Sequence, residues 1–107
     1  MKRREKELKK TVQVYGDIEL KNELDEILNG PIQLKYYKTY NNCKRQKPYG
    51  IGVIKTYCND VETDIEKREF NHIFSKENDA NNMLDILIKN KVTPITLKDV
   101  LEDFILV

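Results

Sequence analysis

The sequence predicts an α+β fold in which an antiparallel sheet of three to four strands is covered by a C-terminal helical hairpin. Two observations carry this prediction. Apolar side chains alternate with polar ones over much of residues 32–57, as in strands with one solvated face. From residue 75 onward, the apolar spacing becomes that of two amphipathic helices. Strands followed by helices indicate a sheet with its helices packed on one side.

The beginning of the chain differs in composition from the remainder. Residues 2–10 carry six basic and two acidic side chains and only one apolar residue, Leu8. We therefore expect residues 1–10 to form a flexible basic tail, because so few apolar groups cannot offset the entropy of ordering the segment. A length of 107 residues fits one domain, which we place at 11–107.

The first part of the domain has one clear strand signal and one ambiguous segment. Val12 and Val14 indicate a short strand. Residues 17–29 fit a strand by alternation and a helix by the spacing of Leu20, Leu24, Ile27 and Leu28. Asp17 is a candidate N-cap and Gly30 a candidate stop, so the composition favours a helix without excluding a strand.

Three later segments have the alternation of strands. Residues 32–40 and 49–57 each place apolar side chains on one face. Gly50 and Gly52 face the other side of their strand and leave room for a neighbour to pack closely. A last strand is expected over 61–70, with a solvated face formed by Glu62, Asp64, Glu66 and Arg68.

Two amphipathic helices close the sequence, joined by a short turn that contains Thr93 and Pro94. Ser75 is the expected N-cap of the first helix, and Thr96 with Asp99 resembles a capping box for the second. We expect two apolar stripes to face the sheet, formed by Ala80, Met83, Leu84 and Leu87 and by Leu97, Val100, Leu101, Phe104 and Ile105.

Composition excludes several classes of protein. The net charge is +1, so the whole molecule is not steered towards nucleic acid or anionic lipid. No apolar run approaches the about 18 residues that a membrane span needs, and no secretory signal is recognisable, so we expect a cytoplasmic protein without membrane contact. Cys43, Cys58 and His72 are too few for a structural zinc site, and we expect no cofactor.

Catalytic motifs are missing from the sequence. It has no glycine-rich phosphate loop, and His72 lies among apolar residues at a strand end with no recognisable nucleophile motif. Asp99 and Asp103 share one helix face, where like charges are more typical of a solvated surface than of an acid–base pair. We therefore expect a protein that is not an enzyme.

Two kinds of binding remain open. We expect a regulatory or adaptor role through contact with another protein, with the acidic side chains Asp99, Glu102 and Asp103 as candidate contacts. The alternative is single-stranded nucleic-acid binding by the basic, tyrosine-rich segment 35–49, where cations beside aromatic rings suit phosphates and stacked bases. Its candidate contacts are Lys35, Tyr37, Lys38, Lys44, Arg45 and Lys47. If these tyrosines pack inside the fold and the lysines are merely solvated, that alternative loses its basis.

The second half of the chain also carries a resemblance. Residues 49–51 opening a strand, Ser75 before a helix and the closing run 92–104 are the matching pieces. Over about residues 49–105 the chain resembles a family of short bacterial proteins of unknown function. The resemblance implies a small cytoplasmic bacterial protein, and it transfers no functional residue because no activity is assigned to that family.

Overall fold

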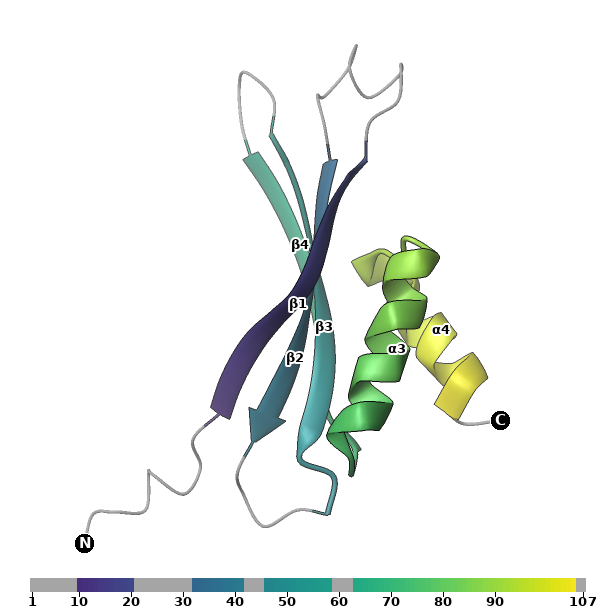
Figure 1. The fold of residues 1–107 in the computed structure, drawn as a ribbon. Coiled ribbons are helices and arrows are strands. Elements are labelled where there is room, and N and C mark those ends of the chain that lie inside the picture. Colours follow the sequence, from purple (N-terminus) through teal and green to yellow (C-terminus); the bar gives the residue numbers. More distant parts are fainter. Residues whose placement is uncertain (1–9, 21–31, 42–45, 59–62, 106–107) are drawn as a thin grey trace, which may run out of the picture.

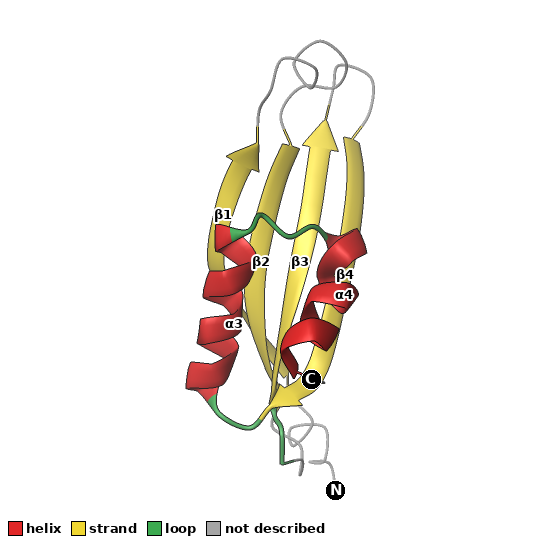
Figure 2. Cartoon of the chain, turned by 90° about the vertical axis from the view of Figure 1, so that its right-hand side faces the viewer, coloured by secondary structure: helices red, strands yellow, loops and turns green. Residues whose placement is uncertain are grey.

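A computed structural model describes residues 10–20, 32–41, 46–58 and 63–105. Its strands form one antiparallel sheet in sequence order, so each strand lies beside its neighbour in the chain (Figure 1). The elements in order are β1 (Lys10–Leu20), β2 (Ile32–Asn41), β3 (Tyr49–Cys58), β4 (Thr63–Phe74), α3 (Glu77–Lys89) and α4 (Pro94–Ile105). Both helices lie on the same face of the sheet, α3 over β1 and β2 and α4 over β3 and β4 (Figure 2). The predicted fold class is confirmed.

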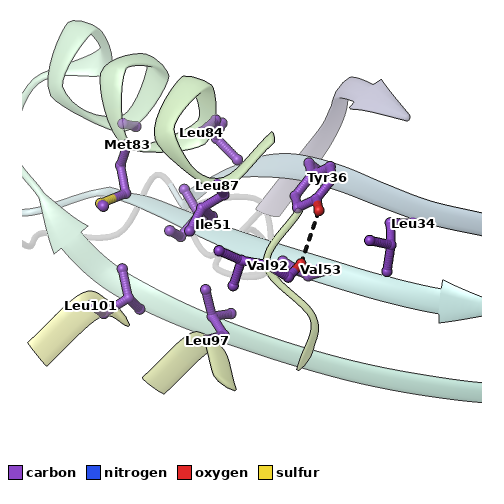
Figure 3. Close-up of a cluster of buried hydrophobic side chains, with 11 residues drawn as sticks. Leu34, Tyr36, Ile51, Val53, Met83, Leu84, Leu87, Val92, Leu97 and Leu101 are labelled. Carbon is purple, nitrogen blue, oxygen red and sulfur yellow. Dashed lines mark hydrogen bonds between the residues drawn. The ribbon is translucent and has the colours of Figure 1, made fainter. Parts of the chain in front are cut away.

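The pairing register decides which side chains meet the helices. Tyr36 of β2 lies opposite Val53 of β3, and Lys38 lies opposite Ile51. Residues directly opposite one another share a face, so these side chains form the helix-covered face of the two central strands. Together with the helices they enclose one core, made of Leu34, Tyr36, Ile51, Val53, Ala80, Met83, Leu84, Leu87, Val92, Leu97 and Leu101 (Figure 3).

β1 is longer than the sequence predicts, and the preference for a helix from residue 17 is wrong over Asp17–Leu20. Ile18 and Leu20 lie opposite Leu34 and Ile32 of β2. This cross-strand pairing outweighs the weak helical propensity of the segment. Residues 21–31, where the ambiguity continues, lie outside the described residues.

The expected tail boundary also moves, because Lys10 is the first residue of β1 and not part of a flexible tail. Residues 1–9 lie outside the described residues. The β1–β2 register shifts between Val14 and Gly16. At this bulge Gly16 turns towards α3, and a Cβ added to Gly16 would lie 2.9 Å from the Ile88 side chain.

β4 also extends further than predicted, to Phe74. The described residues of its predicted charged face are exposed as expected. They do not, however, lie on the face of the sheet that is free of helices. Glu66 lies opposite Lys55, and Arg68 lies opposite the core residue Val53, so both are on the helix-bearing face. Both are exposed to solvent. Glu62 lies outside the described residues.

The predicted helix caps are wrong by one to three residues. Lys76, not Ser75, occupies the N-cap of α3, and its side chain makes no capping hydrogen bond. α4 begins at Pro94, and the backbone N–H of Thr96 donates to the Thr93 carbonyl within the first turn. Proline suits the first helical position because that position needs no N–H donor, so the helix starts two residues before Thr96.

The Tyr36 hydroxyl ties the core to the connection between the helices. Tyr36 is fully buried and donates a hydrogen bond of 2.9 Å to the Val92 carbonyl (Figure 3). Burial raises the pKa of Tyr36 to about 12.

We expect Tyr36→Phe to lower the free energy of unfolding by about 1–2 kcal/mol, because the Val92 carbonyl loses its partner inside the core. Urea denaturation measures this loss. Tyr40→Phe is the matched control, because Tyr40 lies on the same strand with 40% of its surface exposed. Equal stability changes in the two variants would contradict the prediction.

Candidate protein-contact surface beside helix α4

The last turn of α4 exposes a large apolar side chain that the sequence places in the core. Phe104 continues the stripe of Leu97 and Leu101, yet 59% of its surface is exposed, while those two leucines are buried. The prediction that Phe104 is buried is wrong. Phe104 lines an open hollow at the surface, so it is not enclosed by a neighbouring element.

An open groove of about 350 Å³ runs beside Phe104 between the two helices. Phe74 at the end of β4 and Met83 and Ile86 of α3 supply apolar walls, and Phe104 and Ile105 supply the α4 side. The antiparallel course of the helices brings the beginning of α3 next to the end of α4 (Figure 2). Apolar side chains from three elements therefore meet at one surface.

One acidic side chain lines the groove, and two others lie on the exposed side of α4. Asp79 from the first turn of α3 lines it directly. Asp103 immediately precedes Phe104, and Asp99 lies one turn earlier on the same face of α4; all three aspartates are exposed. None of these three carboxylates forms an ion pair within the described residues. The groove is thus mostly apolar, with Asp79 as its one acidic lining residue.

Of the three acidic residues predicted from the sequence, Glu102 stands apart. It lies 3.6 Å from the Lys98 ammonium, and both side chains line a different hollow, on the β4 side of α4. Asp103 is next in sequence to the groove residue Phe104, and Asp99 lies one turn earlier on α4, but neither of them lines the groove. Sequence reasoning missed Asp79, whose proximity depends on the antiparallel arrangement of α3 and α4.

Of the residues predicted for nucleic-acid contact, those that the structure describes do not share one surface. Lys38 points to the helix-covered face, is only 6% exposed, and pairs with Glu77 at 2.5 Å and with Asn81 at 2.8 Å. Lys35 and Tyr37 lie on the opposite face, where Tyr37 is 2% exposed and offers no free ring to a base. Lys47 is exposed near the end of β4, and Lys44 and Arg45 lie outside the described residues.

The buried position of Tyr37 follows from the glycines of β3. Its ring lies across Gly52, and its hydroxyl donates a 2.6 Å hydrogen bond to Glu69 of β4. Val14, Tyr37, Gly52 and Glu69 occupy one row across the sheet. The expectation that Gly52 leaves room for a close neighbour is confirmed, and that neighbour is Tyr37.

Glu69 is the centre of a polar network on the face without helices. It accepts hydrogen bonds from Tyr37, from Asn71 at 3.0 Å and from Lys10 of β1. Burial by itself raises the pKa of Glu69, but the hydrogen bonds from Lys10, Tyr37 and Asn71 and the charge of Lys10 outweigh it and lower the pKa to about 2. Each of these donors stabilises the charged carboxylate. The network therefore connects β1 and β2 to β4 through side chains.

Within the described residues, no group of three or more His, Cys, Asp or Glu side chains is placed to hold a metal ion. Neither described helix combines the length and apolar character needed to cross a membrane.

The fold and this surface define a class of protein: a small α+β domain with helices on one face of a four-stranded meander and an acidic, apolar groove between them. The chain belongs to a family of unknown function (DUF6514), whose model matches residues 15–107. This match confirms the resemblance seen in the sequence and extends it towards the N-terminus, through β1 and β2. No curated protein and no solved structure matches the chain.

Proposed function

We propose that this protein is a non-enzymatic regulator or adaptor that binds another protein through the groove between α3 and α4. The exposure of Phe104 beside that groove is the observation that carries the proposal. A large aromatic side chain next to an apolar hollow is typical of the few residues that dominate the binding energy of protein interfaces.

The charge around the groove selects the chemistry of the partner. Asp79 gives the groove a negative charge, and Asp99 and Asp103 add negative charge on the exposed side of α4. A partner segment with an apolar side chain to fill the groove and lysine or arginine beside it complements both properties. This negative charge also opposes the approach of a nucleic-acid backbone.

The segment predicted for nucleic-acid binding supports the same proposal by its placement. Tyr36 and Tyr37 are buried, and Lys38 is paired with Glu77, so these three residues are not available to phosphates or bases. The groove is therefore the better-supported contact site.

We expect Phe104→Ala to weaken partner binding at least tenfold, because it removes the aromatic group that a partner covers. Full-length wild-type and variant proteins are used as baits in native lysate, and the captured protein is then purified so that its Kd can be measured for each bait. Ile95→Ala is the matched control, since Ile95 is 71% exposed on the same helix but does not line the groove.

Charge reversal at Asp79 and Asp103 tests the predicted chemistry of the partner. Asp79→Lys with Asp103→Lys is expected to weaken binding further, and the wild-type affinity is expected to fall as salt rises. Equal binding by wild type and Phe104→Ala, or recovery of nucleic acid without a stoichiometric protein, contradicts the proposal.

A further inference from the structure

A second hollow lies on the other side of α4, away from the groove between the helices. Its volume is about 310 Å³, and its walls are mostly apolar. Phe70 and Ile73 of β4 form one wall, and Leu101 and Ile105 of α4 form the other. We call this hollow the β4–α4 pocket.

The β4–α4 pocket is built by an irregularity at the end of β4. Ile51 lies opposite Phe70 and Tyr49 lies opposite Phe74, so residues 71–73 oppose Gly50 alone. His72, within this bulge, has φ of 60°, in the left-handed region that non-glycine residues adopt uncommonly, histidine more often than most. Bulges and strained residues of this kind are frequent beside binding sites, because they redirect side chains out of the regular alternation. Here, His72 and Ile73 both line the pocket.

One positive charge at the β4–α4 pocket has no counterpart among the described residues. Lys98 is balanced by Glu102, whose carboxylate lies 3.6 Å from its ammonium. Lys47 also lines the pocket, but it forms no ion pair within the described part of the chain. The His72 Nδ1–H donates to the Lys47 carbonyl over 3.1 Å, which ties the backbone of Lys47 to the strained bulge. An apolar hollow with one excess cation suits an amphipathic anion.

We propose that the β4–α4 pocket binds a small apolar monocarboxylate, with its hydrocarbon part between Phe70, Ile73 and Leu101 and its carboxylate beside the Lys47 ammonium. Pockets for small ligands begin at about 300 Å³ and are typically apolar with a few polar groups that fix orientation. The pocket is at the lower end of that range, which suits a molecule of roughly ten non-hydrogen atoms. The two sites share Ile105, but Phe104, which carries the proposed protein contact, does not line this pocket.

Titration of the ¹⁵N-labelled full-length protein with octanoate tests the site. We expect chemical-shift changes centred on His72, Ile73 and Leu101, with saturation at low millimolar octanoate or below. Octylamine, which has the same chain with a cationic head, is expected to bind at least tenfold more weakly. Absence of saturable shifts at these residues, or equal binding of the two probes, overturns the proposal.

Lys47→Glu gives a second readout that does not depend on stability. It is expected to weaken octanoate binding at least tenfold and to strengthen octylamine binding, while the spectrum keeps its dispersion. Two variants serve as controls: Lys89→Glu changes the net charge equally at an exposed position on α3, and Phe104→Ala alters only the neighbouring groove. Both controls are expected to bind octanoate like the wild type, and a loss in Lys89→Glu that equals that in Lys47→Glu contradicts the assignment to Lys47.

Discussion

Gly52→Ala is expected to lower the free energy of unfolding by about 3 kcal/mol, although alanine is the smallest possible addition. A Cβ at this position would lie 2.2 Å from Cζ of Tyr37 and 2.4 Å from its hydroxyl oxygen. Tyr37 cannot move aside without losing its hydrogen bond to Glu69 and exposing a ring that is now 2% accessible. In an open strand the same substitution stabilises by about 0.5–1 kcal/mol, because glycine loses more backbone entropy on folding.

A double-mutant cycle isolates the contact between residues 52 and 37. In a Tyr37→Ala background we expect Gly52→Ala to cost less than about 1 kcal/mol, because the overlapping ring is gone. Gly16→Ala is a useful comparison, since its Cβ meets only the flexible end of Ile88 at 2.9 Å and a small effect is expected. The same loss from Gly52→Ala in both backgrounds, measured by urea denaturation, means that the close approach of Tyr37 is not the cause.

Acidification is expected to remove about 2–3 kcal/mol of stability that Glu69 provides at neutral pH. The pKa of Glu69 is lowered from 4.5 to about 2 in the folded protein. The unfolded chain therefore takes up the proton first, and the stabilisation is fully present above about pH 5. It is lost as the pH falls through 4.5 towards 2, where the folded carboxylate is also protonated.

Glu69→Gln separates this contribution from the titration of other carboxylates. The difference in unfolding free energy between wild type and Glu69→Gln is expected to be largest near pH 7 and to disappear near pH 2. Glu66→Gln is the matched control on the same strand, because Glu66 is exposed and lies 4.0 Å from Lys55. A constant difference across this pH range would show that Glu69 acts by shape and not by its charge.

The sequence predicted most of the architecture because apolar periodicity is a local property. Alternation over residues 32–57 and helical spacing from residue 75 identify two central strands and both helices. The same reasoning failed over Asp17–Leu20, where periods of two and of 3.6 residues both fit and pairing with β2 decided the outcome. It also failed at Phe104, because a stripe shows which side of a helix faces inward but not whether a neighbouring helix closes over it.

The candidate sites were less accessible to sequence reasoning. Asp99 and Asp103 were identified as acidic residues of one helix face, whereas Asp79 shares the groove lining with Phe104 only because the two helices run antiparallel. His72 was noted as a histidine at a strand end. Its left-handed backbone and its bond to Lys47 depend on the bulge opposite Gly50.

The amino-acid pattern alone determined that this chain forms strands and then helices, and which sides of both helices carry the apolar stripes. The tertiary structure alone decided which of these residues meet. Glu69 and Tyr37 are 32 residues apart in the chain, and they touch because β2 and β4 flank β3 in a register that places Gly52 between them. Register, bulges and the spacing of packed helices arise from contacts between distant segments, so no window of the sequence contains them.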